Sequence, residues 1–311
     1  MLAWQTIAPM TNPRIAVVGS TNIDLIAYTP RIPGPGETIE GERFQMGFGG
    51  KGANQAVMAR ILGAEVWMVN CLGDDPYGSM TLNNFAERGI DTTHVHRVPG
   101  SSGVAPIWVE PDGTNRIIII PGANHGLTPE QAMAAIADIE PSVVVGQFEI
   151  PQTVTAAGFR AAKERSATTI LNPAPASPIV DELLEVSDWI VPNEVEFSVL
   201  FDRDPDDDAL VEVAGSLGQR LAVTLGGEGC ALVDGGNVYR VPAPSVAPVD
   251  TTGAGDAFVG AFAYGLATGL DERRAAALAN ACAADSVTRP GTQSSFPSPE
   301  EARRLLAEIS G

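Results

Sequence analysis

The sequence predicts an α/β fold built around a mainly parallel sheet. Short apolar runs of strand length alternate with segments of helical periodicity from Arg14 to the end of the chain, an order typical of parallel strands connected by helices. With 311 residues, 44% of them hydrophobic and 18% charged, the chain is long enough to bury one large core or two ordinary ones. We expect a single domain over residues 14–311, preceded by a flexible N-terminal extension over residues 1–13, which contains two prolines and no Lys or Arg.

Individual elements follow from these two patterns. Strands are expected at residues 15–19, 65–69, 142–146, 168–172, 189–192 and 221–225. Helices with apolar residues about every 3.6 positions are expected at residues 53–62, 80–88, 129–136, 154–164, 210–217 and 257–266. Because the two kinds of segment alternate, the helices are expected to wrap the sheet.

Two segments interrupt the alternation. Residues 28–48 and 94–120 have the character of extended chain, with Pro and Gly turns at residues 33–36 (PGPG) and 111–113 (PDG). We expect them to form antiparallel strands at one edge of the sheet, as a small lid. Exposed strand edges with apolar runs such as residues 117–120 invite pairing, so we also expect a homodimer joined through the lids.

Charge and composition exclude several classes of partner. The net charge of −19 repels nucleic-acid backbones, so no nucleic-acid partner is expected. No apolar run approaches the roughly 20 residues that span a bilayer, so no membrane span is expected either. The three cysteines form no CxxC pair and lie among apolar neighbours, as is typical of free thiols in the reducing cytoplasm. Any bound phosphate must then be held by backbone N–H groups, helix N-termini or a metal ion.

The segment at residues 250–256 (DTTGAGD) is the most informative. Its small residues lead directly into an apolar helix, and such a turn presents unpaired N–H groups and the positive end of the helix dipole to an anion. Asp256 lies inside this predicted anion hole, where a carboxylate does not help to bind phosphate but can accept a proton from an attacking hydroxyl. For this segment alone, an acid placed in the first helical turn for its dipole interaction is an alternative of equal weight.

A second glycine-rich run covers residues 47–56 (GFGGKGANQA). It matches GxGxxG by letter but follows a turn-rich segment rather than a core strand, so a dinucleotide site is not indicated. A Walker A loop is excluded as well, because Lys51 is followed by Gly rather than by Ser or Thr. Close approach of the backbone to a ligand remains, with Lys51 and Asn54 available to hydrogen-bond hydroxyl groups.

The tripeptide Asn22-Ile23-Asp24 follows the first predicted strand, at the edge where ligands of open α/β sheets bind. A neighbouring amide and carboxylate suit the vicinal hydroxyls of a sugar. Asx residues that cap a turn explain this tripeptide equally well on its own.

Taken together, these segments resemble the ribokinase family of carbohydrate kinases, from about Arg14 to the C-terminus. The matching motifs are residues 19–24 (GSTNID), 49–56 (GGKGANQA), 121–124 (PGAN), 171–175 (LNPAP), 192–194 (PNE), 224–226 (TLG) with Gly229, and 250–256 (DTTGAGD). So many motifs in order set the resemblance apart from a chance match. It implies a three-layer α/β/α fold with a small β-sheet lid.

The resemblance also implies the roles of individual residues. The sugar would be held by Asn22, Asp24, Gly50, Lys51, Asn54 and Glu149, with Ala105 and Ile107 from the lid. Asp256 would be the catalytic base, beside an anion hole formed by Gly253, Ala254 and Gly255. ATP would be bound by Asn193, Thr224, Gly226, Gly229, Gly255 and Asn280.

The same resemblance implies two metal ions. Mg²⁺ would accompany ATP and bridge its phosphates. K⁺ would lie beside the anion hole, several of its ligands being backbone carbonyls, at Asp250, Thr252, Ser286, Arg289, Gly291 and Ser295. Pro290 is a departure within this stretch, because a proline there can redirect the neighbouring carbonyls.

The implied reaction is the ATP-dependent phosphorylation of D-ribose at its 5-hydroxyl, giving ribose 5-phosphate. Another acceptor, such as deoxyribose, fructose, a nucleoside or a sugar phosphate, is the alternative, and a non-catalytic sugar-binding protein is a more distant one. A sugar-phosphate acceptor would need Arg or Lys to pair with its phosphate, and the sugar motifs offer only Lys51. The intact Asp256 argues against a protein that has lost catalysis.

Overall fold

The computed structural model of the protein describes residues 12–310. All but the last two residues of the predicted extension over residues 1–13 therefore lie outside the described residues. The main sheet contains β1 (Arg14–Val18), β4 (Glu65–Gly73), β5 (Val95–Val98), β8 (Val143–Gly146), β9 (Thr168–Leu171), β10 (Trp189–Ile190), β11 (Arg220–Thr224), β12 (Cys230–Asp234) and β13 (Asn237–Val241).

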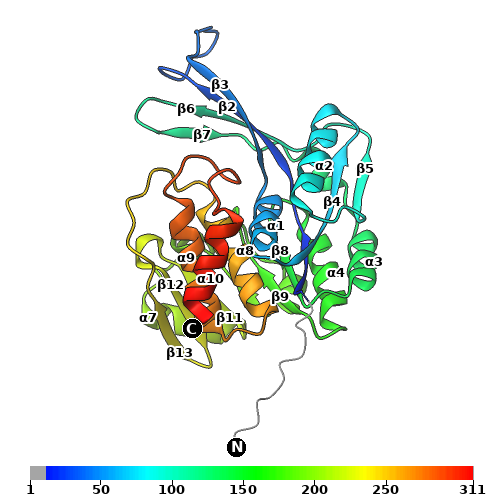
Figure 1. Ribbon diagram of the computed structural model, residues 1–311, viewed down its shortest axis with the longest axis vertical. Coiled ribbons are helices and arrows are strands. Elements are labelled where there is room, and N and C mark those ends of the chain that lie inside the picture. The colour runs from blue at the N-terminus through cyan, green and yellow to red at the C-terminus, as the bar shows by residue number, and fades with distance from the viewer. Residues whose placement is uncertain (1–11, 311) are drawn as a thin grey trace, which may run out of the picture.

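Within the described chain, these strands follow the order β13-β12-β11-β10-β9-β8-β1-β4-β5 (Figure 1). Neighbouring strands from β11 to β5 pair in parallel, and β12 and β13 extend the sheet in antiparallel orientation at the other edge. The predicted α/β class with a mainly parallel sheet is confirmed.

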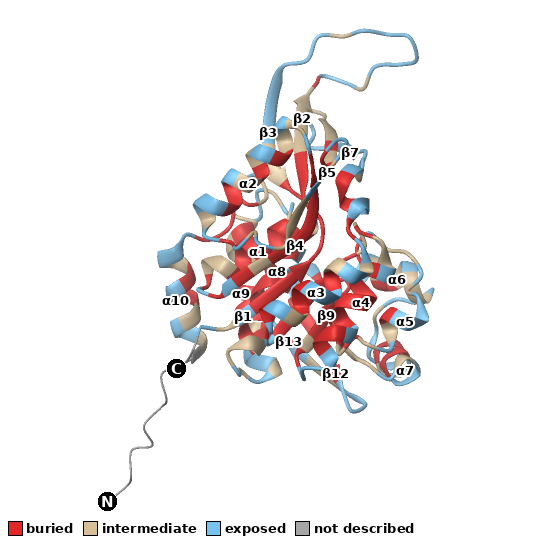
Figure 2. Ribbon diagram, turned by 90° about the vertical axis from the view of Figure 1, so that its right-hand side faces the viewer, coloured by how far each residue is buried: buried red, intermediate tan, exposed pale blue. Residues whose placement is uncertain are grey.

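Helices cover both faces of the main sheet, and the buried residues concentrate between the layers (Figure 2). The helices are α1 (Lys51–Ile61), α2 (Pro76–Arg88), α3 (Pro129–Ile139), α4 (Gln152–Lys163), α5 (Asp181–Leu184), α6 (Glu194–Phe201), α7 (Asp207–Leu217), α8 (Ala254–Ala267), α9 (Glu272–Ser286) and α10 (Pro299–Ser310). Alternate residues of β1 point to opposite faces. Ile15 and Val17 belong to the core with α1, α8 and α9, and Ala16 and Val18 belong to the core with α3 and α4.

The predicted lid is a separate sheet that projects from one end of the molecule (Figure 1). Its strands are β2 (Asn22–Tyr28), β3 (Arg43–Gly49), β6 (Val104–Val109) and β7 (Asn115–Ile117), in the order β3-β2-β6-β7. β2–β3 and β6–β7 are antiparallel, as expected, but β2 and β6 pair in parallel. The lid is therefore a mixed sheet made of two antiparallel pairs laid side by side.

The lid boundaries differ from the sequence expectation in two places. The lid begins at Asn22 rather than at residue 28, because β2 starts soon after the end of β1. Val95–Val98, expected in the lid, is β5 and pairs in parallel with β4 at the edge of the main sheet. Both differences have one cause, since a short extended segment carries no local sign of the sheet that it joins.

Several helices begin earlier than apolar periodicity indicates. Asp75 caps α2 by accepting from Gly78 N over 2.8 Å, and Asp206 caps α7 by accepting from Ala209 N over 2.8 Å. Polar capping residues define these starts, so a pattern of apolar residues detects the helix only from its second turn.

Close contact between α1 and α8 creates the surroundings of the site. A Cβ on Gly260 of α8 would lie 2.5 Å from the main-chain oxygen of Gln55 on α1. A Cβ on Gly52 of α1 would lie 2.6 Å from Ser20 N, just after β1. Only glycine allows these distances, so the N-terminal parts of both helices meet near the carboxyl end of β1.

The cysteines occupy the cores on the two faces of the sheet. Cys71, Cys230 and Cys282 are buried free thiols. Burial raises the pKa of Cys71 to about 11 and that of Cys230 to about 12, and it also raises the pKa of Cys282. Among the helices of the described chain, none has the length and apolarity to cross a membrane.

Candidate active site

Asp256 lies in the first turn of α8 and is 6% exposed. Asn54 Nδ2 donates to its Oδ2 over 2.8 Å, and Gln55 Nε2 donates to its Oδ1 over 3.0 Å. Both donors belong to the N-terminal half of α1. These bonds satisfy the buried carboxylate and fix its plane, while each oxygen keeps a second lone pair that can accept a proton.

The turn before Asp256 has the features of an anion hole, with one difference from the prediction. Gly253 has a φ of 79° at the N-cap of α8, a conformation that favours glycine. A Cβ on Gly255 would meet no atom within 4 Å, so this residue borders open space. Ala254 N, in contrast, donates to Thr251 O over 3.2 Å. The amide of Ala254 is therefore already engaged, and an anion bound at this turn would depend on the other amides.

A narrow cavity of about 130 Å³ opens at this helix N-terminus. Its walls include Lys51, Asn193, Thr224, Gly253, Gly255 and Asp256. The cavity therefore brings residues predicted for the sugar together with residues predicted for ATP.

Asp24 forms the lid side of the site. The pairing of β2 with β3 places it opposite Gly47, and a Cβ on Gly49 would lie 2.4 Å from Asp24 Oδ2. Burial, and then the negative charges of Glu149 and Asp256, raise the pKa of Asp24 to about 7. Hydroxyl groups that donate to this carboxylate would favour its ionised form.

Other predicted sugar contacts surround Asp24. Asn124 Nδ2 donates to Asn22 Oδ1 over 3.0 Å, which orients the Asn22 amide and leaves its Nδ2 as a donor. Ala105 pairs opposite Asp24 across β2 and β6. Ile107 lies two residues farther along β6, on the same face of the lid sheet.

Glu149 and Gly50 hold the start of α1. Glu149 Oε2 accepts from Lys51 N over 2.9 Å and also from Ser20 Oγ. Gly50 has a φ of 88°, and a Cβ there would lie 2.6 Å from Asn22 N, so glycine is required where α1 approaches β2. The predicted sugar-binding role of Glu149 thus adds to a structural one, because its carboxylate caps a helix N-terminus.

Among the described residues that line the cavity, Lys51 carries the cationic side chain. Burial lowers the pKa of its ammonium group, but the negative charges of Asp256, Glu149 and Glu196 outweigh burial, so that the pKa is raised. Lys51 is therefore charged at neutral pH and can neutralise a phosphoryl group in the cavity.

Glu196 is a cavity residue that sequence reasoning missed. It forms a capping box with Asn193 at the start of α6, in which Asn193 Oδ1 accepts from Glu196 N over 2.7 Å and Glu196 Oε2 accepts from Asn193 N over 2.9 Å. Burial is the main cause that raises the pKa of Glu196. The signal was available, because Asn-x-x-Glu is a recognisable helix start.

Comparison with known proteins identifies the family of the chain that carries this site. A family model described as pfkB family carbohydrate kinase matches residues 12–299. The chain belongs to the pfkB family of carbohydrate kinases. This kinase is 39% identical to the ribokinase of Lactococcus lactis, over 95% of this chain and 98% of the relative. It is 40% identical to the deoxyribokinase of Salmonella typhi, over 94% of this chain and 98% of the relative.

A solved structure gives the same result. Arabidopsis thaliana ribokinase, complexed with ribose and ATP, matches with a TM-score of 0.87 and 30% identity, over 95% of this chain and 99% of that chain. The family resemblance and the three-layer fold with a lid, both predicted from the sequence, are confirmed.

Three residues predicted to bind ATP are not among the described residues that line the cavity: Gly226, Gly229 and Asn280. Gly229 N donates to Gly226 O over 3.1 Å in the short turn after β11. Asn280 is 3% exposed, and its Nδ2 donates to Val241 O over 2.8 Å. Their contact with a nucleotide stays a prediction.

Asp250 connects the two loops predicted to bind K⁺. Its Oδ1 accepts from Thr252 N and its Oδ2 accepts from Gly291 N, both over 2.9 Å. On the second loop, Arg289 Nη2 donates to Ser295 O over 2.7 Å. Asp250 therefore holds the two loops together, and the carbonyl of Ser295, a residue predicted to bind K⁺, is already engaged by a guanidinium group.

Ser286, also predicted for K⁺, ends α9. It is 1% exposed, and its hydroxyl donates to Ala283 O over 2.8 Å. In the part of the chain that the structure describes, no group of three His, Cys, Asp or Glu residues could hold a metal ion. A cation at these loops would therefore be bound mainly by carbonyl oxygens, and the K⁺ site stays a prediction.

Sequence reasoning also missed amide side chains around the carboxylate. Gln55 is fully buried, and its Nε2 donates to Asn172 Oδ1 over 3.1 Å as well as to Asp256. Gln293 Nε2 donates to Asn54 Oδ1 over 3.0 Å. Asn54 was expected to bind the sugar, and it is also a support of Asp256. A polar residue on the apolar helix face at position 55 was the one local signal.

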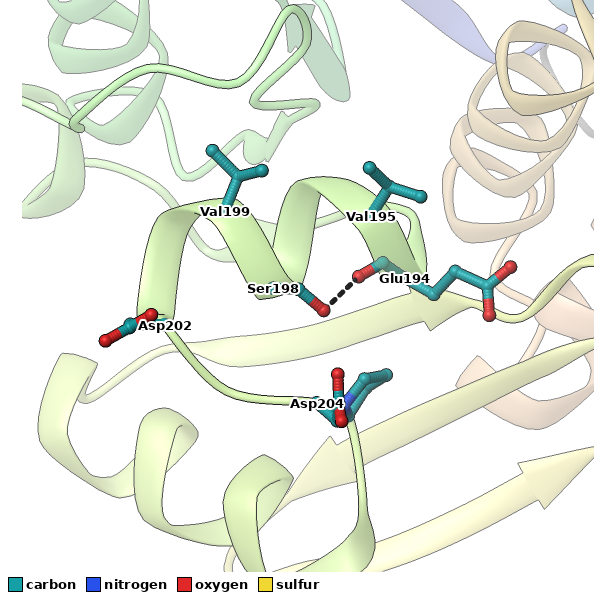
Figure 3. Close-up of a pocket in the computed structure, with 7 residues that line it drawn as sticks. Glu194, Val195, Ser198, Val199, Asp202 and Asp204 are labelled. Carbon is teal, nitrogen blue, oxygen red and sulfur yellow. Dashed lines mark hydrogen bonds between the residues drawn. The ribbon is translucent and has the colours of Figure 1, made fainter.

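A wider groove of about 700 Å³ runs beside α6 (Figure 3). Figure 3 shows Val195 and Val199 pointing to the same side of the helix, with Asp202 at its end and Asp204 in the segment that follows. Glu194 adds a third carboxylate. These negative charges repel phosphate groups, so the groove does not suit the phosphates of ATP.

Proposed function

We propose that this kinase phosphorylates D-ribose at its 5-hydroxyl with ATP, yielding ribose 5-phosphate and ADP. The observation that carries the proposal is the buried carboxylate of Asp256 at the N-terminus of α8, in a cavity shared with Lys51 and Thr224. Two of the relatives above support ribose as the acceptor, since both are ribokinases and one is complexed with ribose and ATP.

Asp256 accepts the proton of the sugar hydroxyl while the hydroxyl oxygen attacks the γ-phosphorus of ATP. As the new P–O bond forms, the bond to the β-phosphate oxygen breaks, and ADP leaves with that electron pair. Negative charge on the transferring group is stabilised by the amides of the turn around Gly255 and by the ammonium group of Lys51. The sugar is held on its other side by Asp24.

Mg²⁺ bound with ATP would compensate the charge of its phosphates. The cavity residues fit such an ion, because Glu196 adds a carboxylate to the wall. Asn193 N engages Oε2 of this carboxylate, and a cation beside the group would favour its ionised form.

Deoxyribose is the second candidate acceptor, because a deoxyribokinase is as similar to the chain as the ribokinase. A coupled assay of ADP formation should compare ribose, deoxyribose, fructose, adenosine and fructose phosphate. We expect the highest kcat/KM for ribose. A higher value for deoxyribose would reassign the acceptor, and no acceptor-dependent ADP formation would reject the kinase reaction.

K⁺ is expected to raise kcat about tenfold, equivalent to about 1.4 kcal/mol in the barrier. Asp250 joins the two loops beside the anion hole, and a cation there would fix the peptide planes whose N–H groups face the phosphoryl group. Initial rates in K⁺, Na⁺ or Tris alone, at constant ionic strength, measure the effect. Equal rates in all three would show that the chain does not use the ion.

We further propose a homodimer through the lids. Phe44 on β3 is 66% exposed, and the four isoleucines at residues 117–120 are exposed by 41% to 54%. Light scattering at micromolar concentration should give about twice the chain mass of 32.4 kDa. Ile118→Asp should shift the protein to the monomer, whereas Val195→Asp, on exposed α6, should not. A monomeric mass for the parent protein contradicts the proposal.

We place the kinase in the cytoplasm. The three buried cysteines are all free, which fits a reducing compartment, and ATP is available there. Recovery of the native protein from a periplasmic or extracellular fraction would contradict this placement.

A further inference from the structure

A chain of hydrogen bonds leads from the surface of α2 to the carboxylate of Asp256. Arg88 Nε donates to Asn84 Oδ1 over 3.1 Å, and Asn84 Nδ2 donates to Gln293 Oε1 over 3.3 Å. Gln293 Nε2 donates to Asn54 Oδ1 over 3.0 Å, and Asn54 Nδ2 donates to Asp256 Oδ2 over 2.8 Å. This series of hydrogen bonds therefore joins α2, the loop after α9, α1 and α8.

The two end groups of this series of hydrogen bonds determine which atom donates in every bond of the series. A guanidinium group only donates and a carboxylate only accepts, so Arg88 and Asp256 leave one orientation for each amide between them. Turning any amide over would place N–H against N–H or oxygen against oxygen. Asn84, Gln293 and Asn54 are only 7%, 6% and 5% exposed, so water cannot readily replace a lost partner, and a reversal leaves buried groups unpaired.

Gln293 holds a particular place in this chain. It is not in the cavity wall, and its bond to Asn54 reaches across 239 residues of sequence. We propose that Gln293 is a positioning residue for phosphoryl transfer. By engaging Asn54 Oδ1, it directs Asn54 Nδ2 to Asp256 and so fixes the plane of the carboxylate. The proposal rests on the role of Asp256 as the base, proposed above.

Two consequences separate positioning from ordinary packing. Without Gln293, Asn54 Oδ1 is buried without a partner, so the Asn54 side chain is no longer held on that side and the plane of the Asp256 carboxylate is less fixed. We therefore expect kcat to fall while the KM for ATP stays unchanged. The effect should also vanish when Asp256 is replaced, because the base that Gln293 positions is then absent.

The test uses the full-length kinase. Gln293→Met keeps the length of the side chain and removes the donor, and we expect kcat with ribose to fall about tenfold. Gln293→Glu offers only acceptors to Asn54 Oδ1, and we expect a fall of about 100-fold. Ser294→Ala changes the exposed neighbour in the same loop and should keep the parent kcat. In all three variants the KM for ATP should stay within about twofold of the parent.

The deciding measurement is a double-mutant cycle. In the Asp256→Asn background, Gln293→Met should change the residual rate by less than about twofold. A tenfold further loss there, or an unchanged kcat in the single variant, overturns the proposal. Should Gln293→Met not fold, Asn84→Leu removes the preceding bond and should show the same non-additivity. Near-parent activity of Asp256→Asn would instead remove Asp256 from the role of base, and absence of ribose-dependent ADP formation in the parent would reject the proposed function, so these failures can be told apart from a failure of the Gln293 proposal.

Discussion

Asp256→Asn is expected to lower kcat for ribose phosphorylation by about 10² to 10⁴-fold, the usual contribution of a general base, with ribose and ATP still bound. The amide has nearly the size of the carboxylate but cannot take the hydroxyl proton. It also faces the two donors, Asn54 and Gln55, one of which must turn away. A coupled assay measures kcat, and calorimetry measures binding of each substrate.

Asp271→Asn is the matched control for this substitution. Asp271 caps α9 by accepting from Arg274 N over 2.9 Å, and it is exposed. Because Asn caps a helix about as well as Asp, this replacement should leave both kcat and the melting temperature close to those of the parent. Turnover of Asp256→Asn within about threefold of the parent would remove Asp256 from the role of base.

Asp24→Asn is expected to raise the KM for ribose by roughly 10- to 150-fold. This range corresponds to about 1.5 to 3 kcal/mol for a hydrogen bond to a charged group. The KM for ATP should change little, because Asp24 is predicted to contact the sugar and not the nucleotide. Glu149→Ala should raise the KM for ribose too, but it also releases Lys51 N and is therefore harder to interpret.

The pKa of Asp24 makes this prediction dependent on pH. Its value of about 7, against an ordinary 3.8, means that the carboxylate forms as pH rises through neutrality. The ribose KM of the parent should therefore fall between about pH 6 and 8, and that of Asp24→Asn should not follow. The stability of the protein without ribose changes with pH in the opposite direction to ribose binding. The folded state binds the proton more tightly than the unfolded chain, so the free energy of unfolding falls as pH rises from about 4 to about 7.

Asp112→Asn tests whether these effects are specific to Asp24. Asp112 lies in the exposed turn between β6 and β7, where it accepts from Thr114 N over 2.9 Å. Its replacement should leave the ribose KM and its pH dependence unchanged. A ribose KM within about threefold of the parent in Asp24→Asn would show that Asp24 does not bind the sugar.

The main sheet can be predicted from local patterns, whereas the lid boundaries cannot. Val143–Gly146 is buried throughout, and the shortness and β-branched residues of this apolar run between two helices favour a buried parallel strand. Val95–Val98 and Asn115–Ile117 are both short and extended, yet one pairs with β4 and the other with β6. The choice of partner depends on contacts between distant segments, which no local pattern contains.

The candidate site divides in the same way. Asp256 and Lys51 follow glycine-rich runs that are unusual in themselves, so motifs single them out as candidates. Asp24 is singled out by its place soon after the first strand, and it lies in β2. Nothing around Gln293 marks it locally, because its role arises only when the loop after α9 packs beside α1. The contact of Asp24 with Gly49 likewise depends on the register of β2 and β3, which is set by the fold as a whole.

The burial of the three cysteines determines how the protein responds to thiol reagents. Oxidants and alkylating agents attack the thiolate, and the raised pKa values of Cys71, Cys230 and Cys282 keep these groups protonated at neutral pH. The extent of alkylation of the native kinase therefore measures the fraction of molecules in which the core has opened. A cysteine introduced at Glu40, in the exposed loop of the lid, would be the reactive thiol of the folded protein. A fluorophore attached there would follow the lid without a background from the core.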